Sequence, residues 1–249
     1  MHIISIYSPK GGVGKSVTSV NLAYLLSNSG FKTLLWDMDM QGASSFYLKV
    51  KPKLDKKIEK LLIDYSSIDK NIKESDYENL YIIPSDIKLR EIDIILDDLK
   101  KASKKVKKTL EEGGNFFDFI IIDAPPGFTN VNKLISKISD FVLIPLIPTV
   151  LSMRSLNMVY DFFESENINK GKIHPFFSMA DMRKGIHKNI IDENIKRFNI
   201  KTVIPYSSEI EKMGIHLKAV NDFSNSKNIK EIYERFKDEI LLLCKKINE

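Results

Sequence analysis

A glycine-rich loop near the start of the chain reads Lys10-Gly11-Gly12-Val13-Gly14-Lys15-Ser16. It follows the apolar run Ile3–Ser8 and precedes a segment with helical spacing, Ser16–Asn28. Glycines let the backbone bend closely around a phosphate chain, and the start of the next helix adds unpaired N–H donors. This order of strand, loop and helix predicts a phosphate-binding site, with Lys15 on the phosphates and the Ser16 hydroxyl on Mg²⁺.

Short apolar runs alternate with helical patterns along the rest of the chain. Nearly continuous apolar strands are typical of a parallel sheet that is buried on both faces. The alternation predicts an α/β fold, a doubly wound and mostly parallel sheet with helices on both faces. We find no internal repeat and no Pro/Gly/Ser-rich linker, so residues 1–249 are expected to form a single domain. The predicted strands are Ile3–Ser8, Thr33–Trp36, Leu80–Pro84, Phe119–Asp123, Phe141–Pro145, Ile173–Phe177 and Thr202–Ile204, and the predicted helices are Ser16–Asn28, Ile87–Glu112, Val131–Ser139, Ser152–Glu164, Ile186–Phe198 and Asn228–Lys246.

Two acidic stretches follow later strands of this pattern. Asp37-Met38-Asp39-Met40-Gln41-Gly42 comes after the second strand, and the run Phe119–Ile122 ends in Asp123. Ligands of open α/β sheets bind beyond the carboxyl ends of the strands, so these carboxylates are expected near the glycine-rich loop. An aspartate after an apolar strand can hold Mg²⁺ through water, because Mg²⁺ keeps much of its hydration.

The loop departs from the standard P-loop pattern, because Pro9 stands where the first glycine belongs and a lysine follows it. In this it resembles the deviant Walker A loop of the ParA/MinD ATPases. Asp37–Gly42 resembles the second acidic motif of that family, with Met40 in place of a proline, and Asp123–Pro126 resembles its Asp-x-Pro-Pro segment. The resemblance covers the whole chain and is closest to the ParA branch without an N-terminal DNA-reading extension.

The resemblance implies ATP and Mg²⁺ as cofactors. It implies that Lys10 reaches across an ATP-bound dimer to the partner's phosphates, that Lys15 and Asp39 complete the catalytic set, and that Asp39 acts on the attacking water. Val17 replaces a usual threonine, so a hydroxyl contact to the α-phosphate is absent. The nucleotide-contacting residues are then Lys10, Gly11, Gly12, Val13, Gly14, Lys15, Ser16 and Val17, and the Mg²⁺ residues are Ser16, Asp37 and Asp123.

The base site rests on two segments near the carboxyl end. Ser178–Arg183 resembles the family's Thr-Met-x-Asp-x-Arg segment, and Thr202–Pro205 its Thr-x-Ile-Pro segment. By that resemblance Met179 and Pro205 lie near the adenine, although both also fit ordinary core positions at strand ends. No Asn-Lys-x-Asp motif of a guanine site is present, which favours adenine.

The resemblance also implies a function. ParA-like ATPases form an ATP-dependent homodimer that binds DNA without sequence preference, and a centromere-binding or other partner protein stimulates slow hydrolysis of ATP to ADP and phosphate, which releases the DNA. Plasmid or chromosome partition is the expected process, with a MinD-like membrane switch, a ParA-like cargo-positioning ATPase and a nucleotide-binding module with little turnover as alternatives. The candidate DNA contacts are Arg183, Lys184, Lys212 and Lys218.

Composition agrees with these expectations without selecting among them. The net charge is +5, which permits contact with nucleic acid or an anionic membrane. The single Cys244 excludes an internal disulfide, and we expect a cytoplasmic protein that is nucleoid-associated when ATP is bound. The C-terminal segment Ile229–Ile247 carries apolar residues at helical spacing, which fits either a membrane surface or a helix packed on the sheet; we expect the second.

Overall fold

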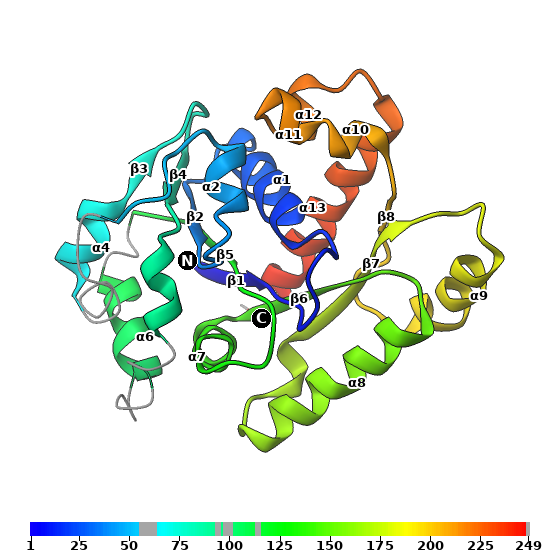
Figure 1. The fold of residues 1–249 in the computed structure, drawn as a ribbon, viewed down its shortest axis with the longest axis horizontal. Helices are drawn as coiled ribbons and strands as arrows, with labels where there is room; N and C mark the ends of the chain where they lie inside the picture. The colour runs from blue at the N-terminus through cyan, green and yellow to red at the C-terminus, as the bar shows by residue number, and fades with distance from the viewer. Residues whose placement is uncertain (55–63, 93–95, 97–101, 113–115, 248–249) are drawn as a thin grey trace.

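The computed structural model describes residues 1–54, 64–92, 96, 102–112 and 116–247. Its centre is one eight-stranded sheet with the order β3-β4-β2-β5-β1-β6-β7-β8 (Figure 1). Neighbouring strands run parallel except β3, which pairs antiparallel with β4 at one edge. The strands are β1 (His2–Ile6), β2 (Thr33–Asp37), β3 (Lys73–Glu74), β4 (Leu80–Ile83), β5 (Phe119–Asp123), β6 (Phe141–Leu146), β7 (Ile173–Ala180) and β8 (Val203–Pro205).

Helices cover both faces of the sheet (Figure 1). The longer ones are α1 (Lys15–Asn28), α6 (Ala102–Glu112), α7 (Asn130–Ile138), α8 (Val150–Ser165), α9 (Gly185–Asn194) and α13 (Lys227–Ile247). Shorter ones are α2 (Ala43–Tyr47), α4 (Tyr65–Asn71), α10 (Ser208–Glu211), α11 (Met213–His216) and α12 (Val220–Phe223), with 3₁₀ turns η1 (Ile87–Glu91), η2 (Lys170–Lys172) and η3 (Ile195–Arg197).

Side chains of the central strands alternate between two cores. In β5, Ile120 and Ile122 join the core under α6, α7 and α8, whereas Ile121 joins the core under α1 and α13. All residues of β2, β5 and β6 are buried. Burial on both faces explains why these strands read as continuous apolar runs, and the predicted doubly wound sheet is confirmed.

The structure differs from the sequence prediction at one long helix and one short strand, and it adds the short helices α2, α4, α10, α11 and α12. The long helix predicted over Ile87–Glu112 is wrong at its start, where Asp86 caps a 3₁₀ turn, η1, by accepting a hydrogen bond from the Lys88 amide. Its second half is α6, and residues 93–95 and 97–101 lie outside the described part. The two-residue strand β3 is too short to give a periodic signal in the sequence.

The apolar stripe of α13 packs against the sheet. Ile232, Phe236, Ile240 and Leu243 are all buried, and the Phe236 ring lies 4.8 Å from that of Phe176 in β7. These four side chains are therefore not available to a bilayer. Among the residues that the structure describes, no helix has the length and apolar character to cross a membrane.

Candidate nucleotide-binding site

The carboxyl ends of three adjacent strands bring the predicted motifs together. Asp37 at the end of β2 is the register partner of Asp123 at the end of β5. On its other side Asp123 pairs with Ile6, the last residue of β1, from which the glycine-rich loop departs. The parallel pairing thus places both aspartates beside the loop, as the open-sheet rule predicts.

The backbone of the loop requires glycine at two positions. Gly12 and Gly14 have φ of 70° and 87°, a left-handed conformation that side chains with a Cβ rarely adopt. A Cβ on Gly14 would also lie 2.9 Å from the Ser178 hydroxyl oxygen. Gly14 is the residue before α1, so the free amides of the first helical turn open onto the loop.

Lys15 is the inner lysine of the loop. Its side chain is buried, and burial lowers the pKa of its ammonium, while the nearby Asp123 and Asp39 act in the opposite direction. A buried ammonium has lost much of its hydration, and phosphate oxygens can supply the hydrogen-bond acceptors that water no longer provides.

Asp123 is the centre of the acidic side of the site. It is fully buried and accepts hydrogen bonds from the hydroxyls of Ser44 (2.7 Å) and Ser19 (3.3 Å), and the neighbouring Ser16 hydroxyl acts to lower its pKa. Burial raises its pKa, because the charged form lacks solvation. A bound cation would favour the ionised form, and the oxygen-only donors of Ser16 and Asp123 are of the kind that Mg²⁺ prefers.

Asp37 is buried beside Asp123, and its carboxylate is hydrogen-bonded to helix α2. Its Oδ2 accepts from the Ser45 amide at 2.8 Å and from the Ser45 hydroxyl at 2.7 Å, and both bonds fix the start of α2. Burial and the neighbouring Asp123 raise the pKa of Asp37. In the described part of the chain no three His, Cys, Asp or Glu side chains cluster as a metal cage, so an Mg²⁺ here would need phosphate and water oxygens as well.

Asp39 lies at the mouth of the same group. It is 8% exposed, and its Oδ1 accepts from the Gln41 amide at 3.0 Å. Its carbonyl accepts from the Ser85 hydroxyl at 2.5 Å, which ties the loop after β2 to the end of β4. The carboxylate is thus held at the rim by its own backbone turn, with Lys15 close enough to interact electrostatically.

Lys10 points away from this group. Its ammonium donates a 2.8 Å hydrogen bond to the carbonyl of Leu151 in the first turn of α8. Val150 and Leu151 are both about two-thirds exposed, at 66% and 65%. The two lysines of the loop therefore serve different surroundings, Lys15 the buried carboxylates and Lys10 the surface at α8.

The loop after Asp123 is tied to the residue that precedes Lys10. The Gly127 amide donates to the Pro9 carbonyl at 3.1 Å, and the Gly127 carbonyl accepts from the Tyr7 hydroxyl at 3.0 Å. Asn132 of α7 donates to the carbonyls of Pro125 and Gly127 at 3.0 and 2.8 Å. These bonds join the two loops into one layer beside the phosphate site.

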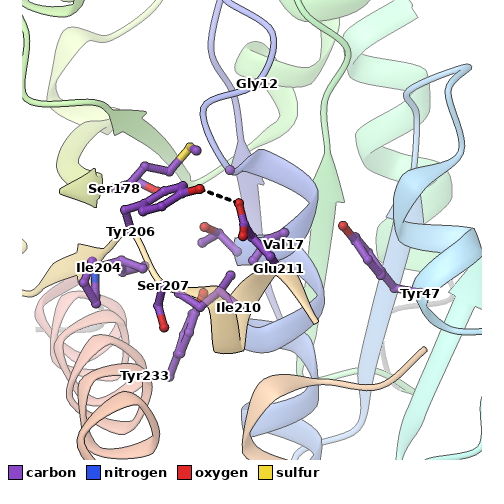
Figure 2. A pocket seen from close by; sticks show the side chains of 14 residues that line it. Gly12, Val17, Tyr47, Ser178, Ile204, Tyr206, Ser207, Ile210, Glu211 and Tyr233 are labelled. Carbon is purple, nitrogen blue, oxygen red and sulfur yellow. Dashed lines mark hydrogen bonds between the residues drawn. The ribbon is translucent and has the colours of Figure 1, made fainter. Parts of the chain in front are cut away.

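A cavity of about 400 Å³ opens beside the loop (Figure 2). Met179 and Pro205, the two residues expected near the adenine, both lie on its wall, and Met179 has φ of 54° where β7 shifts register against β8. The wall also contains Gly12, Gly14, Val17, Thr18, Tyr47, Ser178, Ile204, Tyr206, Ser207, Ile210, Glu211 and Tyr233.

Several site residues were not predicted. Ser44 and Ser45 donate hydrogen bonds to the two buried aspartates, and their only signal in the sequence is a serine pair that begins two residues after Gly42. Tyr206, Glu211 and Tyr233 belong to segments far along the chain. Only the folded sheet brings these segments to the phosphate loop.

The four candidate DNA contacts lie in two groups. Arg183 and Lys184 precede α9, whereas Lys212 and Lys218 belong to the α10–α12 region (Figure 1). Three of the four are paired with carboxylates: Arg183 with Asp181 at 2.9 Å, Lys212 with Glu209 at 2.6 Å, and Lys218 with Asp222 at 3.0 Å. Exposed pairs of this kind are weak, so a phosphate can compete for each cation.

An anion-binding glycine loop at a helix start, with aspartates on adjacent ends of a mostly parallel sheet, defines a P-loop nucleoside triphosphatase. Comparison with known proteins supports a narrower assignment. Residues 1–175 match the family model described as an AAA domain. The chain is 30% identical to the sporulation initiation inhibitor protein Soj of Bacillus subtilis over 93% of its length and 94% of that protein. It is 28% identical to the chromosome-partitioning ATPase Soj of Treponema pallidum over the same shares. The chain belongs to the ParA/Soj family of partition ATPases.

Solved structures agree with this fold. A plasmid partition protein of Borrelia burgdorferi B31 bound to AMPPNP matches 96% of this chain and 98% of its own, with a TM-score of 0.76 and 27% identity. Apo McdA of Cyanothece matches 96% of this chain and 99% of its own, with a TM-score of 0.84 and 22% identity, and therefore supports the fold alone.

Proposed function

We propose that this protein is an Mg²⁺-dependent ATP hydrolase whose ATP-bound form is a homodimer that binds DNA without sequence preference. A centromere-binding or other partner protein stimulates hydrolysis, which releases the DNA during plasmid or chromosome partition. The observation that carries the proposal is the division of labour in the loop: Lys15 faces the buried carboxylates, whereas Lys10 points outward to α8. An outward lysine at this point can serve a nucleotide held by a second copy of the chain.

Each residue of the site then has a defined task. The loop amides and Lys15 bind the phosphates, and Ser16 with Asp123 holds Mg²⁺, which offsets phosphate charge when bound. Asp39 orients the water that attacks the γ-phosphate. Lys10 of the second copy offsets charge that grows at the β–γ bridge, as an arginine finger does in other NTPases.

Dimerisation supplies the reason for DNA binding. Sequence-independent binding needs cations presented to phosphates, and two copies joined by ATP double their number. We place the protein in the cytoplasm, on the nucleoid when ATP is bound, with residues 1–249 acting as one unit. The same ATP-dependent cycle of dimerisation and release also fits a cargo-positioning role. The identity of the partner protein would distinguish this role from plasmid or chromosome partition.

Two measurements test the proposal. Mass in solution is determined with magnesium and a non-hydrolysable ATP analogue, and duplex DNA retention is determined with ATP, with ADP and without nucleotide. We expect the mass to double with the analogue. We expect DNA retention with ATP and not with ADP or without nucleotide. A single copy in the first measurement, or equal retention in all three conditions of the second, would contradict the proposed switch.

A further inference from the structure

We propose that Tyr233 reads the nucleobase: its phenol hydroxyl, on the floor of the cavity beside the phosphate loop, hydrogen-bonds a ring nitrogen of a bound purine. This inference rests on the proposed nucleotide-binding function and deepens it, because it names a residue that recognises the base and not the phosphates.

The first observation is an unused polar group. Tyr233 of α13 is fully buried, and among the described residues its hydroxyl has no hydrogen-bond partner. Buried hydroxyls are normally satisfied, since leaving one unpaired is unfavourable by about 1–3 kcal/mol. Tyr233 lines the cavity, and in Figure 2 its hydroxyl points up toward Ser207 and Ile210. A ligand in the cavity would supply the missing partner.

The second observation is the shape and polarity of the space above this hydroxyl. Val17, Ile204 and Ile210 give apolar walls suited to the faces of a flat ring. Gly12 and Gly14 of the phosphate loop form another side of the cavity. A triphosphate attached to a base in the cavity would therefore extend toward this loop. Also on the wall, the Tyr206 hydroxyl donates a hydrogen bond to Glu211 at 2.7 Å (Figure 2).

The third consideration is the protonation state of the phenol. Burial raises the pKa of Tyr233 far above neutral pH, so the hydroxyl keeps its proton. A neutral phenol can donate to a purine ring nitrogen and does not repel the phosphates. Purine ring nitrogens lie on the edges of the ring, which remain accessible when apolar side chains cover its faces.

The test compares Tyr233→Phe with the wild-type protein in calorimetric titrations with a non-hydrolysable ATP analogue and with tripolyphosphate. We expect analogue affinity to fall by roughly 3- to 10-fold, the usual effect of one hydrogen bond, and tripolyphosphate affinity to stay unchanged. Without ligand, the melting temperature should be equal or higher, because the variant removes an unsatisfied hydroxyl. The matched control is Tyr160→Phe on α8, a tyrosine that does not line the cavity.

The outcomes separate this inference from the function on which it rests. Equal analogue affinity in both proteins, or an equal loss of analogue and tripolyphosphate binding, would overturn the role of Tyr233 and leave the ATPase proposal intact. A wild-type protein that binds neither ligand would overturn both.

Discussion

At the scale of single residues, Lys10 and Lys15 stand in one short loop and meet opposite surroundings. Lys15 is buried against Asp123 and Asp39, and Lys10 is bonded to the Leu151 carbonyl at the surface. A substitution of Lys15 therefore disturbs a buried charge cluster, whereas one of Lys10 removes only an outward contact. This difference makes Lys10 the cleaner probe of the proposed dimer mechanism.

Lys10→Ala should abolish partner-stimulated hydrolysis and the ATP-bound dimer. Nucleotide binding should remain, because the loop amides and Lys15 are unchanged. ATPase rate, with and without the stimulating partner protein, and mass in solution are measured with magnesium and ATP, with Lys170→Ala as a control that removes a lysine bonded to Glu164 at the surface. Unchanged turnover in Lys10→Ala would remove Lys10 from the mechanism.

Asp39→Ala should hold the protein in its ATP-bound, dimeric form. The substitution removes the carboxylate expected to orient water, while the phosphate contacts stay in place. Hydrolysis should fall by roughly 100-fold or more, within the range for loss of a general base. The dimer should persist by size-exclusion chromatography with ATP. If the variant remains monomeric with ATP, the role of Asp39 is in metal binding or structure.

At the scale of elements, length decides what the sequence reveals. All seven predicted strands and most long helices are present, because each carries at least one periodic or continuous apolar run. The helices α2, α10, α11 and α12 have four or five residues, too few to show a period. Yet α2 carries Ser44 and Ser45, and α10 carries Glu211, so the missed elements supply site residues.

The site itself divides in the same way. The phosphate loop and the three aspartates are readable because each follows an apolar strand and the sheet rule unites the strand ends. The cavity floor is not, because the sequence shows Tyr233 only as a position in the last helix that resembles the family's, with nothing that places it beside the phosphate loop. The location of the Tyr233 side chain beside the phosphate loop depends on how α13 packs on the sheet, which the sequence pattern does not show.

Strand β7 carries a pH-sensitive contribution to stability. Burial lowers the pKa of His174 to about 4, and its Nδ1 lies 3.0 Å from the Asn199 amide nitrogen. The unfolded chain binds this proton near pH 6.5, so between pH 6.5 and 4 the unfolded state holds more protons than the folded state. The contribution is complete above about pH 6.5 and is lost as the pH falls toward 4.

We expect this loss to reach about 1–2 kcal/mol at pH 5. Urea unfolding at pH 7.5 and pH 5 measures it. The free energy of unfolding should differ less between pH 7.5 and pH 5 in His174→Gln than in the wild-type protein, by that amount. His216→Gln, at an exposed histidine, should keep the wild-type difference in this free energy. Identical pH dependence in all three proteins would contradict the assignment to His174.

At the scale of the whole molecule, the net charge of +5 does not say which cations are free to meet DNA. Arg183, Lys212 and Lys218 each have a carboxylate partner in the same chain. DNA phosphates must compete with these partners, so affinity should depend on the acids beside the bases as well as on the bases themselves.

Asp181→Asn should strengthen DNA retention in the ATP-bound state by about two- to five-fold at low salt, because it frees Arg183 from its ion pair. The asparagine oxygen can still accept from the Arg183 amide, as Asp181 does at 3.1 Å. Glu164→Gln is the matched control, since it makes the same change in net charge beside Lys170. An equal gain in both variants would indicate net charge alone, and no gain in either would place the DNA surface elsewhere.

The bonds from Gly127 to Pro9 and Tyr7 have a mechanical consequence. Residues 124–127 follow Asp123, and Pro9 is the immediate neighbour of Lys10, so a shift of either loop transmits force to the other through a short, stiff linkage. A movement of the loop after Asp123, on loss of the terminal phosphate, would thus shift the backbone beside Lys10 of the same subunit. In the proposed dimer, these two hydrogen bonds would couple loss of the terminal phosphate to the position of Lys10, and so to separation of the two copies.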